Sequence, residues 1–170
     1  VITVAGADDE GVPIAADGDD DGNRLDSPQK LLIHDGVLYV ADSGRHRIAS
    51  VDPATGAVTN VVGATDVRGY LGDGGAPEDA QLSSPFGFAF NAAGRMIIAD
   101  TGNDALRAVF PDGTIDTIAG RGATGFDGDT EASEGASLRS PMDVVHAPDG
   151  DVVFADTENE VVRRIDQPTW

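Results

Sequence analysis

The chain repeats the stretch Leu82-Ser-Ser-Pro-Phe-Gly-Phe-Ala-Phe-Asn-Ala-Ala-Gly-Arg-Met-Ile-Ile-Ala-Asp-Thr-Gly-Asn103, and this repetition is the strongest indication of its fold. A similar stretch begins at Leu25 and another at Leu138. The Ser-Pro prolines stand at positions 28, 85 and 141, and matching glycines stand at positions 6, 63 and 120. Self-similarity at a fixed period is the signature of a repeat protein. Three copies fill the 170 residues.

Each copy contains four short β-type runs separated by turn residues. In the middle copy we expect strands at 86–91, 95–100, 105–110 and 114–119, because these runs are rich in Val, Ile, Phe and Ala and show no helical periodicity. Ala-Ala-Gly94 and Pro-Asp-Gly113 favour tight hairpins between them. Four antiparallel strands per unit, repeated radially, form the blades of an all-β propeller.

The order of these features resembles a known repeat. Ser-Pro, a first strand, a Gly turn, a second strand ending in Ala-Asp, and then Thr-Gly-Asn are similar to the NHL repeat, and the linker at 113–129 resembles its extended bacterial form. The resemblance covers nearly every residue. It implies a β-propeller of NHL type with three four-stranded blades in a single domain, residues 1–170. The repeats span 25–63, 82–120, and 138–166 plus 1–6. NHL propellers usually have six blades, so this chain holds half a ring.

The two ends of the chain bear on assembly. The third copy stops after a third strand, and Val1-Ile-Thr-Val-Ala-Gly6 matches the missing fourth one. We expect a homodimer in which two copies make a six-bladed ring, with each N-terminal strand completing the partner's last blade by edge pairing. An unpaired edge would otherwise be a template for aggregation. The alternatives are a fragment of a longer propeller and a building block whose only activity is self-assembly.

Composition excludes several classes of function. The net charge is −19, from 30 acidic and 11 basic residues, so we expect binding to neither nucleic acid nor anionic membranes. The absence of Cys excludes disulfides, thiolate metal sites and Cys nucleophiles. No apolar run approaches the roughly 20 residues that span a bilayer. No signal peptide is visible, and the composition leaves the compartment open, with an extracellular or periplasmic location favoured.

One face of the predicted propeller carries the longer loops. Connections in an antiparallel blade alternate between its two ends, so the loops after each Ala-Asp and the linkers between blades share a face, here called the long-loop face. Functional residues on rigid scaffolds usually lie on such loops. The residues after each Ser-Pro enter the central channel there, where they either bind a protein, peptide or small ligand or pack around a water-filled channel. The candidate ligand-binding residues are Gln29, Lys30, Phe86, Met142, Asp143 and His46.

An aspartate ends the second strand of every copy, at Asp42, Asp100 and Asp156. Its repetition in every blade favours a structural role in the turn, where its carboxylate would bond backbone amides, over a ring of catalytic groups. We assign no catalytic residue, and the sequence predicts a non-enzymatic scaffold or binding module. The alternative is a metal-dependent lyase or lactone hydrolase, which the resemblance to such six-bladed propellers implies, with Lys30, Asp143 and the histidines as candidates at the axis.

A separate motif concerns metal binding. Asp17-Gly-Asp19-Asp-Asp21-Gly22 matches the first six positions of an EF-hand loop, and oxygen ligands at alternate positions suit Ca²⁺. The twelfth position is Pro28 instead of Glu, so Asp26 is the nearest substitute ligand. The candidate calcium ligands are therefore Asp17, Asp19, Asp21 and Asp26. The alternative is a solvated acidic loop.

Overall fold

The computed structural model describes residues 4–5, 24–120, 125–127 and 133–166. In these residues the chain is built from β-strands and single turns of 3-10 helix, and no helix is long and apolar enough to cross a bilayer. The 3-10 turns are η1 Ser43–Arg45, η2 Pro77–Asp79, η3 Thr101–Asn103, η4 Ser133–Gly135 and η5 Thr157–Asn159. The strands are β1 Pro28–His34, β2 Val37–Asp42, β3 Arg47–Val51, β4 Val58–Val62, β5 Gly87–Phe90, β6 Met96–Asp100, β7 Ala105–Val109, β8 Ile115–Ala119, β9 Pro141–His146, β10 Val152–Asp156 and β11 Val161–Ile165.

The strands form three antiparallel sheets, one per repeat, and the predicted all-β propeller fold is confirmed. The sheet orders are β1-β2-β3-β4 for blade 1, β5-β6-β7-β8 for blade 2 and, within the described residues, β11-β10-β9 for blade 3. The four strands expected in the middle copy are confirmed to within one residue at each end. The expected turns place Gly94 and Gly113 at φ values of 80° and 85°, which glycine adopts at little cost.

The fourth strand expected for blade 3 is not tested. Residues 1–3 and 6 of that segment lie outside the described residues, and Val4 and Ala5 belong to no strand. Pairing between an N-terminal strand and the β11 edge therefore stays a prediction.

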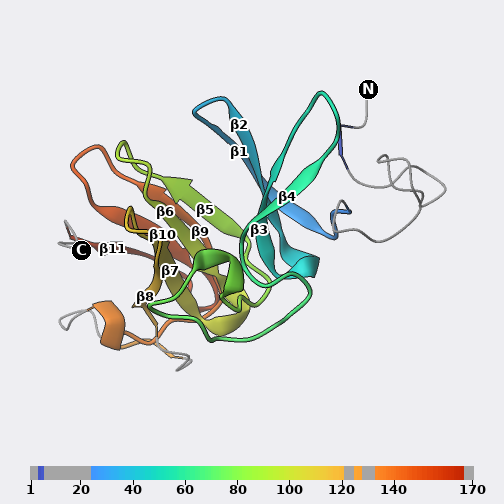
Figure 1. Ribbon diagram of the computed structural model, residues 1–170. Coiled ribbons are helices and arrows are strands. Elements are labelled where there is room, and N and C mark those ends of the chain that lie inside the picture. The colour runs from blue at the N-terminus through green and yellow to red at the C-terminus, as the bar shows by residue number, and fades with distance from the viewer. Residues whose placement is uncertain (1–3, 6–23, 121–124, 128–132, 167–170) are drawn as a thin grey trace.

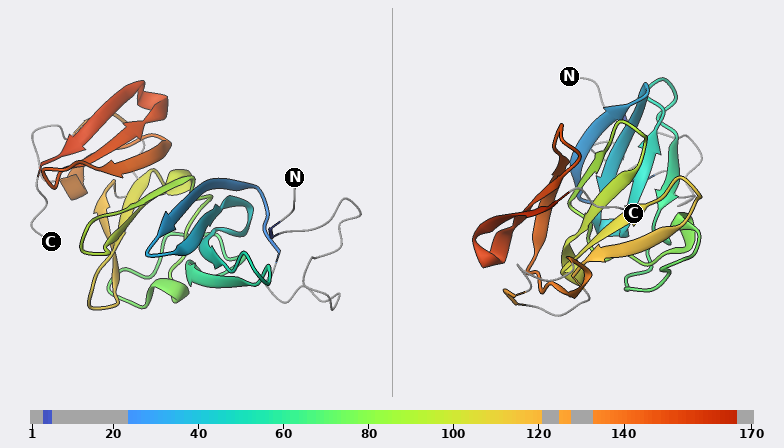
Figure 2. Two further views of the ribbon diagram at one scale, coloured as in Figure 1. Left: turned by 90° about the horizontal axis from the view of Figure 1, so that it is seen from above. Right: turned by 90° about the vertical axis from the view of Figure 1, so that its left-hand side faces the viewer.

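The three sheets follow one another as successive layers (Figures 1 and 2). The first strands of the blades, β1, β5 and β9, are neighbours, since β5 packs against both β1 and β9. The last strands, β4 and β8, lie at the opposite edges of their sheets. The residues that follow each Ser-Pro are thereby gathered along one line, the axis of the predicted propeller.

Successive side chains of a strand point to opposite faces of its sheet, and here both faces carry apolar residues. We call the face toward the next blade its forward face and the face toward the preceding blade its rear face. On the rear face of blade 2, Phe88, Met96 and Ile98 are buried against Ala41 and Ile48 of blade 1. The removal of these apolar side chains from water stabilises the stacking of the two sheets.

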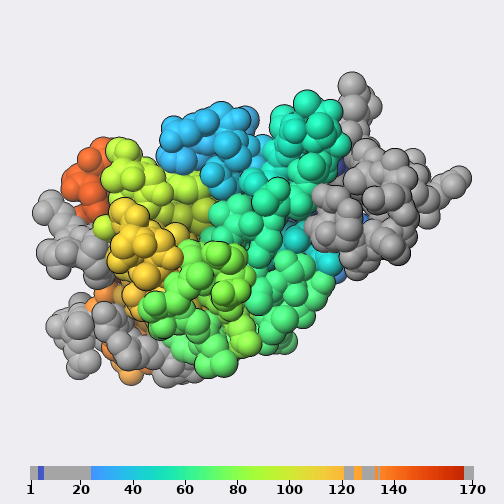
Figure 3. Space-filling model, viewed as in Figure 1, coloured from blue at the N-terminus to red at the C-terminus, as the bar shows by residue number. Residues whose placement is uncertain are grey.

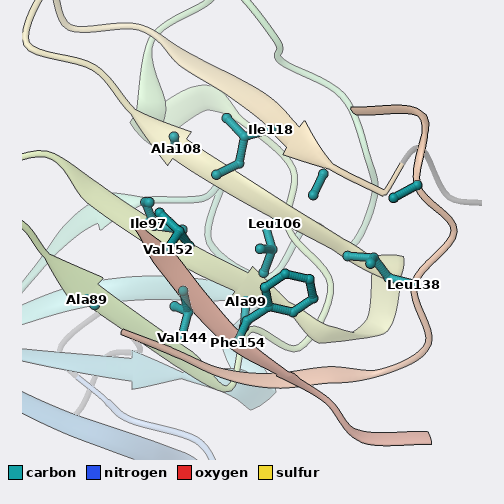
Figure 4. Close-up of a cluster of buried hydrophobic side chains, with 12 residues drawn as sticks. Ala89, Ile97, Ala99, Leu106, Ala108, Ile118, Leu138, Val144, Val152 and Phe154 are labelled. Atoms are coloured by element: carbon teal, nitrogen blue, oxygen red, sulfur yellow. The ribbon is translucent and has the colours of Figure 1, made fainter. Parts of the chain in front are cut away.

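The junction between blades 2 and 3 has the same construction. The forward face of blade 2 meets Val144, Val152 and Phe154 on the rear face of blade 3 in a second buried cluster. Figure 4 shows Val152 and Phe154 among the side chains of blade 2, with Leu106 and Ile97 close by. Each blade therefore has one face that fits the next blade and one that fits the preceding blade.

Candidate functional site

The three Ala-Asp carboxylates are structural. Each side chain is fully buried at the end of the second strand of its blade. Each accepts a backbone N–H from the segment that leads into the first strand, 16 or 17 residues earlier in the chain, and not from its own turn as the sequence had suggested. The pairs are Asp42 with Asp26 at 2.6 Å, Asp100 with Ser83 at 2.7 Å and Asp156 with Arg139 at 2.7 Å.

An arginine faces each of these carboxylates, buried in blades 1 and 2 and partly buried in blade 3. Arg47 Nε lies 2.7 Å from Asp42, Arg107 Nη1 lies 3.6 Å from Asp100, and Arg163 Nη1 lies 3.2 Å from Asp156. Relative to its aspartate, Arg47 comes two positions earlier than the other two arginines. Residues two apart on a strand share a face, so the guanidinium reaches the same place in blade 1. Each arginine also donates to the backbone carbonyl of Arg24, Gln81 or Ser137, which ties the linker to its blade.

Burial governs the protonation of these carboxyls. Removal from water raises the pKa of Asp100 to about 6, against the lowering effects of the Ser83 N–H, the Asn103 amide and the Arg107 guanidinium. Burial also raises the pKa of Asp42. A carboxylate with no exposed surface and with its oxygens occupied by the chain does not face a substrate, so these groups stabilise the fold.

Two polar contacts lock each blade to the next. The first, here called the hydroxyl latch, runs from the residue after the Ala-Asp aspartate to the Ser-Pro carbonyl of the following blade. Ser43 Oγ donates to the Pro85 carbonyl, and Thr101 Oγ1 donates to the Pro141 carbonyl at 2.6 Å. Both hydroxyls are buried, so these bonds are shielded from competing water.

The second contact, here called the amide latch, uses the residue just after the 3-10 turn. His46 Nδ1 accepts the Ser84 N–H at 3.1 Å, and Asp104 Oδ1 accepts the Ser140 N–H at 2.7 Å. His46 was a candidate ligand-binding residue, but the structure places it at the junction of blades 1 and 2. Its equivalence in the repeat to Asp104 is the signal that identifies this role.

The other five candidate residues come together. They line a single hollow on the long-loop side of the first strands, with a volume of about 380 Å³, which is in the range of small-ligand sites. The hollow, here called the axial hollow, is lined by Gln29, Lys30, Leu31, Phe86, Met142 and Asp143. All three blades contribute to it, as the positions after Ser-Pro predicted. Sequence reasoning missed Leu31, the residue that follows Lys30 on β1.

An ion pair crosses this hollow. Lys30 Nζ of blade 1 lies 2.5 Å from Asp143 Oδ1 of blade 3 and 3.5 Å from the Val144 carbonyl. Blade 2 leaves room for it because Gly87 lies between them: a Cβ there would be 2.6 Å from the Asp143 Cα. The Lys30 and Asp143 side chains are 23% and 54% exposed, so water screens the pair and it contributes little stability.

Comparison with known proteins finds sequence similarity to an NHL repeat-containing protein. No family model matches. The chain is 38% identical over 79 residues to Protein SUPPRESSOR OF QUENCHING 1, chloroplastic, of Arabidopsis thaliana, a match covering 46% of this chain and 7% of that protein. It is 33% identical over 89 residues to NHL repeat-containing protein 2 of Bos taurus, covering 52% of this chain and 12% of that protein. The chain thus spans a small part of the curated relatives it matches.

Solved structures show the fold. A structural genomics protein of unknown function from Bacteroides thetaiotaomicron superposes with a TM-score of 0.70 at 22% identity, over 81% of this chain and 34% of that one. The chain has a propeller fold and is similar in sequence to an NHL repeat-containing protein, so it is called the NHL-like unit below. A streptogramin B lyase structure superposes on this NHL-like unit with a TM-score of 0.54 at 16% identity, over 94% of the unit and 43% of that chain.

The calcium candidates of this NHL-like unit are largely outside the described residues. Asp17, Asp19 and Asp21 lie there. The Asp26 carboxylate accepts the Ser27 hydroxyl at 2.8 Å and packs against Gly44, where a Cβ would meet its Cγ at 2.3 Å. Among the described residues, no three His, Asp or Glu side chains gather as a metal site would require. The calcium site stays a prediction.

Proposed function

We propose that this NHL-like unit is a non-enzymatic binding module whose ligand occupies the axial hollow. One observation carries the proposal: side chains from three blades, separated by more than 110 residues in the sequence for Lys30 and Asp143, line a single hollow. The repeated aspartates, the arginines and the latch residues make contacts that hold the fold together. The side chains after Ser-Pro line the hollow and make no such structural contact beyond the exposed Lys30–Asp143 pair.

The lining defines the ligand chemistry. Phe86 and Met142 offer an aromatic and a flexible thioether surface, which adapts to varied apolar groups. Lys30 donates and Asp143 accepts, and because their mutual pairing is weak in water, a ligand can replace it at small cost. A carboxylate of the ligand would bind Lys30, and an ammonium of the ligand would bind Asp143. A peptide or small molecule that carries both charges beside an apolar side chain fits this pattern.

Methionine methyl groups offer a direct test. The chain has two methionines: Met142, 38% exposed, lines the hollow, and Met96, 3% exposed, lies in the core between blades 1 and 2. We would label both methyl groups with ¹³C and titrate a panel of tripeptides with free termini. We expect the Met142 signal to shift and the Met96 signal to stay, with weaker binding in Lys30→Gln. Arg139→Gln, which removes an exposed charge from blade 3 outside the hollow, serves as the matched control. A Met142 signal that no tripeptide moves at millimolar concentration would contradict the proposal.

The second candidate is half of a metal-dependent propeller enzyme, a lyase or lactone hydrolase with its metal on the axis. It is supported by the likeness to a streptogramin B lyase, which at 16% identity concerns the fold alone. Of the described residues that line the hollow, Asp143 is the one carboxylate, and Lys30 already pairs with it. Metal analysis of the purified chain separates the two candidates, since stoichiometric zinc or calcium lost on Asp143→Asn would favour the enzyme.

A further inference from the structure

The forward face of blade 3 is exposed where its counterparts are buried. Val162 on β11 is 73% exposed. The residues at the same position of the repeat, Leu106 on β7 and Ile48 on β3, are fully buried against the next blade. Val145 on β9 is also exposed, at 48%. Blade 3 therefore presents Val162 and Val145, beside the Arg164 side chain, at positions of the face that the other two blades use for packing.

The rear face of blade 1 is likewise exposed, whereas the rear faces of blades 2 and 3 are packed against a neighbouring blade. Ile33 and Leu31 on β1 are 73% and 64% exposed, and Figure 3 shows this part of the chain, in blue, on the molecular surface. Leu31 corresponds to Phe88, which is fully buried in the junction between blades 1 and 2. Ile33 corresponds to Phe90, whose ring stacks on His34 of the preceding blade at 4.1 Å. The position is thus one that packs on a neighbouring blade.

The two halves of each polar latch are also separated, with one half on blade 3 and its complement on blade 1. Thr157 and Glu160 of blade 3 occupy the positions of the hydroxyl donor and the amide acceptor. Thr157 Oγ1 reaches only the Ala155 carbonyl of its own strand at 3.5 Å, and within the described chain the Glu160 carboxylate makes no hydrogen bond. Their complements stand on blade 1, where Ser27 has a φ of 52° and precedes Pro28. Ser84 and Ser140 have φ values of 45° and 47°, so Ser27 already has the geometry of a latched serine.

These two open faces are the halves of one further junction. They cannot meet within one chain, because blade 2 occupies the forward face of blade 1 and the rear face of blade 3. We propose that a second copy of this chain supplies both missing halves, with blade 3 of each copy packed on blade 1 of the other about a two-fold axis. This head-to-tail pairing closes because it occurs twice, giving a ring of six blades.

The second copy also completes the axial hollow. The six lining residues come from the first strands on one side of the axis, and the partner's equivalents would line the other side. The ring itself depends on the sheet faces and latches and does not require the ligand proposed above. Assembly and ligand binding can therefore fail independently.

The test is the mass of the chain in solution, measured by light scattering after size exclusion over a concentration series. We expect twice 17.5 kDa for the wild type. Val162→Asp and Ile33→Asp each place a carboxylate in both symmetric junctions, and each should weaken dimerisation at least about 100-fold, tenfold per junction. Both positions are equally exposed in one chain, so the variants should keep its circular dichroism spectrum. Leu71→Asp is the matched control, since Leu71 is 68% exposed on a linker outside both faces, and it should stay dimeric.

Three outcomes would overturn the inference. A wild-type monomer across the concentration series would mean that the faces are covered by something other than a second copy, such as further blades of a longer chain. A mass that keeps growing with concentration would mean an open array instead of a closed ring. A dimer lost in only one of Ile33→Asp and Val162→Asp would mean that the copies pair through like faces.

Discussion

Replacing Arg107 by Met tests whether the buried arginines hold the blades together. Arg107 is fully buried, donates to Asp73 at 2.6 Å and to the Gln81 carbonyl at 3.3 Å, and lies 3.6 Å from Asp100. Its guanidinium also lies 5.4 Å from the centre of the Tyr70 ring. Met has a similar length and fills most of the space, so the substitution removes charge and hydrogen bonds more than volume.

The magnitude follows from what each contact is worth. Removing one partner of a buried ion pair costs about 3–5 kcal/mol, because the remaining charge stays buried. The Asp73 side chain is 46% exposed and adds little. Arg107 Nε has no partner, so its removal returns about 1 kcal/mol. We therefore expect a loss of about 3 kcal/mol at pH 7, which lowers the melting temperature by about 6–12 °C in a chain of this size.

The assay is urea denaturation at pH 7 and pH 5, with Arg139→Met as the matched control. Arg139 is 51% exposed and pairs with Glu158 of its own blade at the surface, so its loss should cost less than about 1 kcal/mol. In Arg107→Met the penalty should shrink at pH 5, because Asp100 can then take up a proton and needs no counter-ion. Equal costs for the two variants, or a penalty that grows toward pH 5, would refute the assignment of Asp100 and Arg107 as a buried charged pair.

Three further predictions concern other parts of the molecule. Because burial raises the pKa of Asp100 from 3.8 to about 6, its carboxyl favours folding when protonated. The free energy of unfolding relative to Asp100→Asn should therefore rise as pH falls from 7 to 4, by about 2 kcal/mol in denaturation experiments. Gly87→Ala should cost about 1–3 kcal/mol in urea denaturation by overpacking, since its Cβ would lie 2.6 Å from the Asp143 Cα. Calcium should raise the melting temperature of the wild type but not of Asp19→Asn, and equal melting curves would exclude the loop site.

The strands and the axial hollow were predictable from the sequence. Strands such as 105–110 follow from apolar runs between turn residues, and the repeat places their boundaries three times over. Gln29, Phe86 and Met142 could be brought together because each follows a Ser-Pro, and equivalent positions of successive blades lie around one axis. Repetition supplied the long-range information that a single strand pattern lacks.

The side-chain partners were less predictable. Arg47 lies five positions after its aspartate and Arg107 seven, so a fixed spacing does not reveal that both guanidinium groups fill the same place. His46 was assigned to the long-loop face, but a face assignment does not fix the distance from the axis. The 3-10 turn before it directs its ring to the next blade, where it accepts the Ser84 N–H.

The same comparison among copies explains why function should concentrate at the axis. In a repeat protein, a position that is alike in every copy serves a contact that every copy needs, and here it is the buried aspartate that ends each second strand. The position two after Ser-Pro differs in each blade, as Lys30, Gly87 and Asp143. A scaffold of equivalent blades does not need an ammonium, a glycine and a carboxylate at this position, because the same small residue would suit every blade. The row instead places an ammonium and a carboxylate beside apolar side chains within one chain, which suits recognition of a ligand that carries both charges.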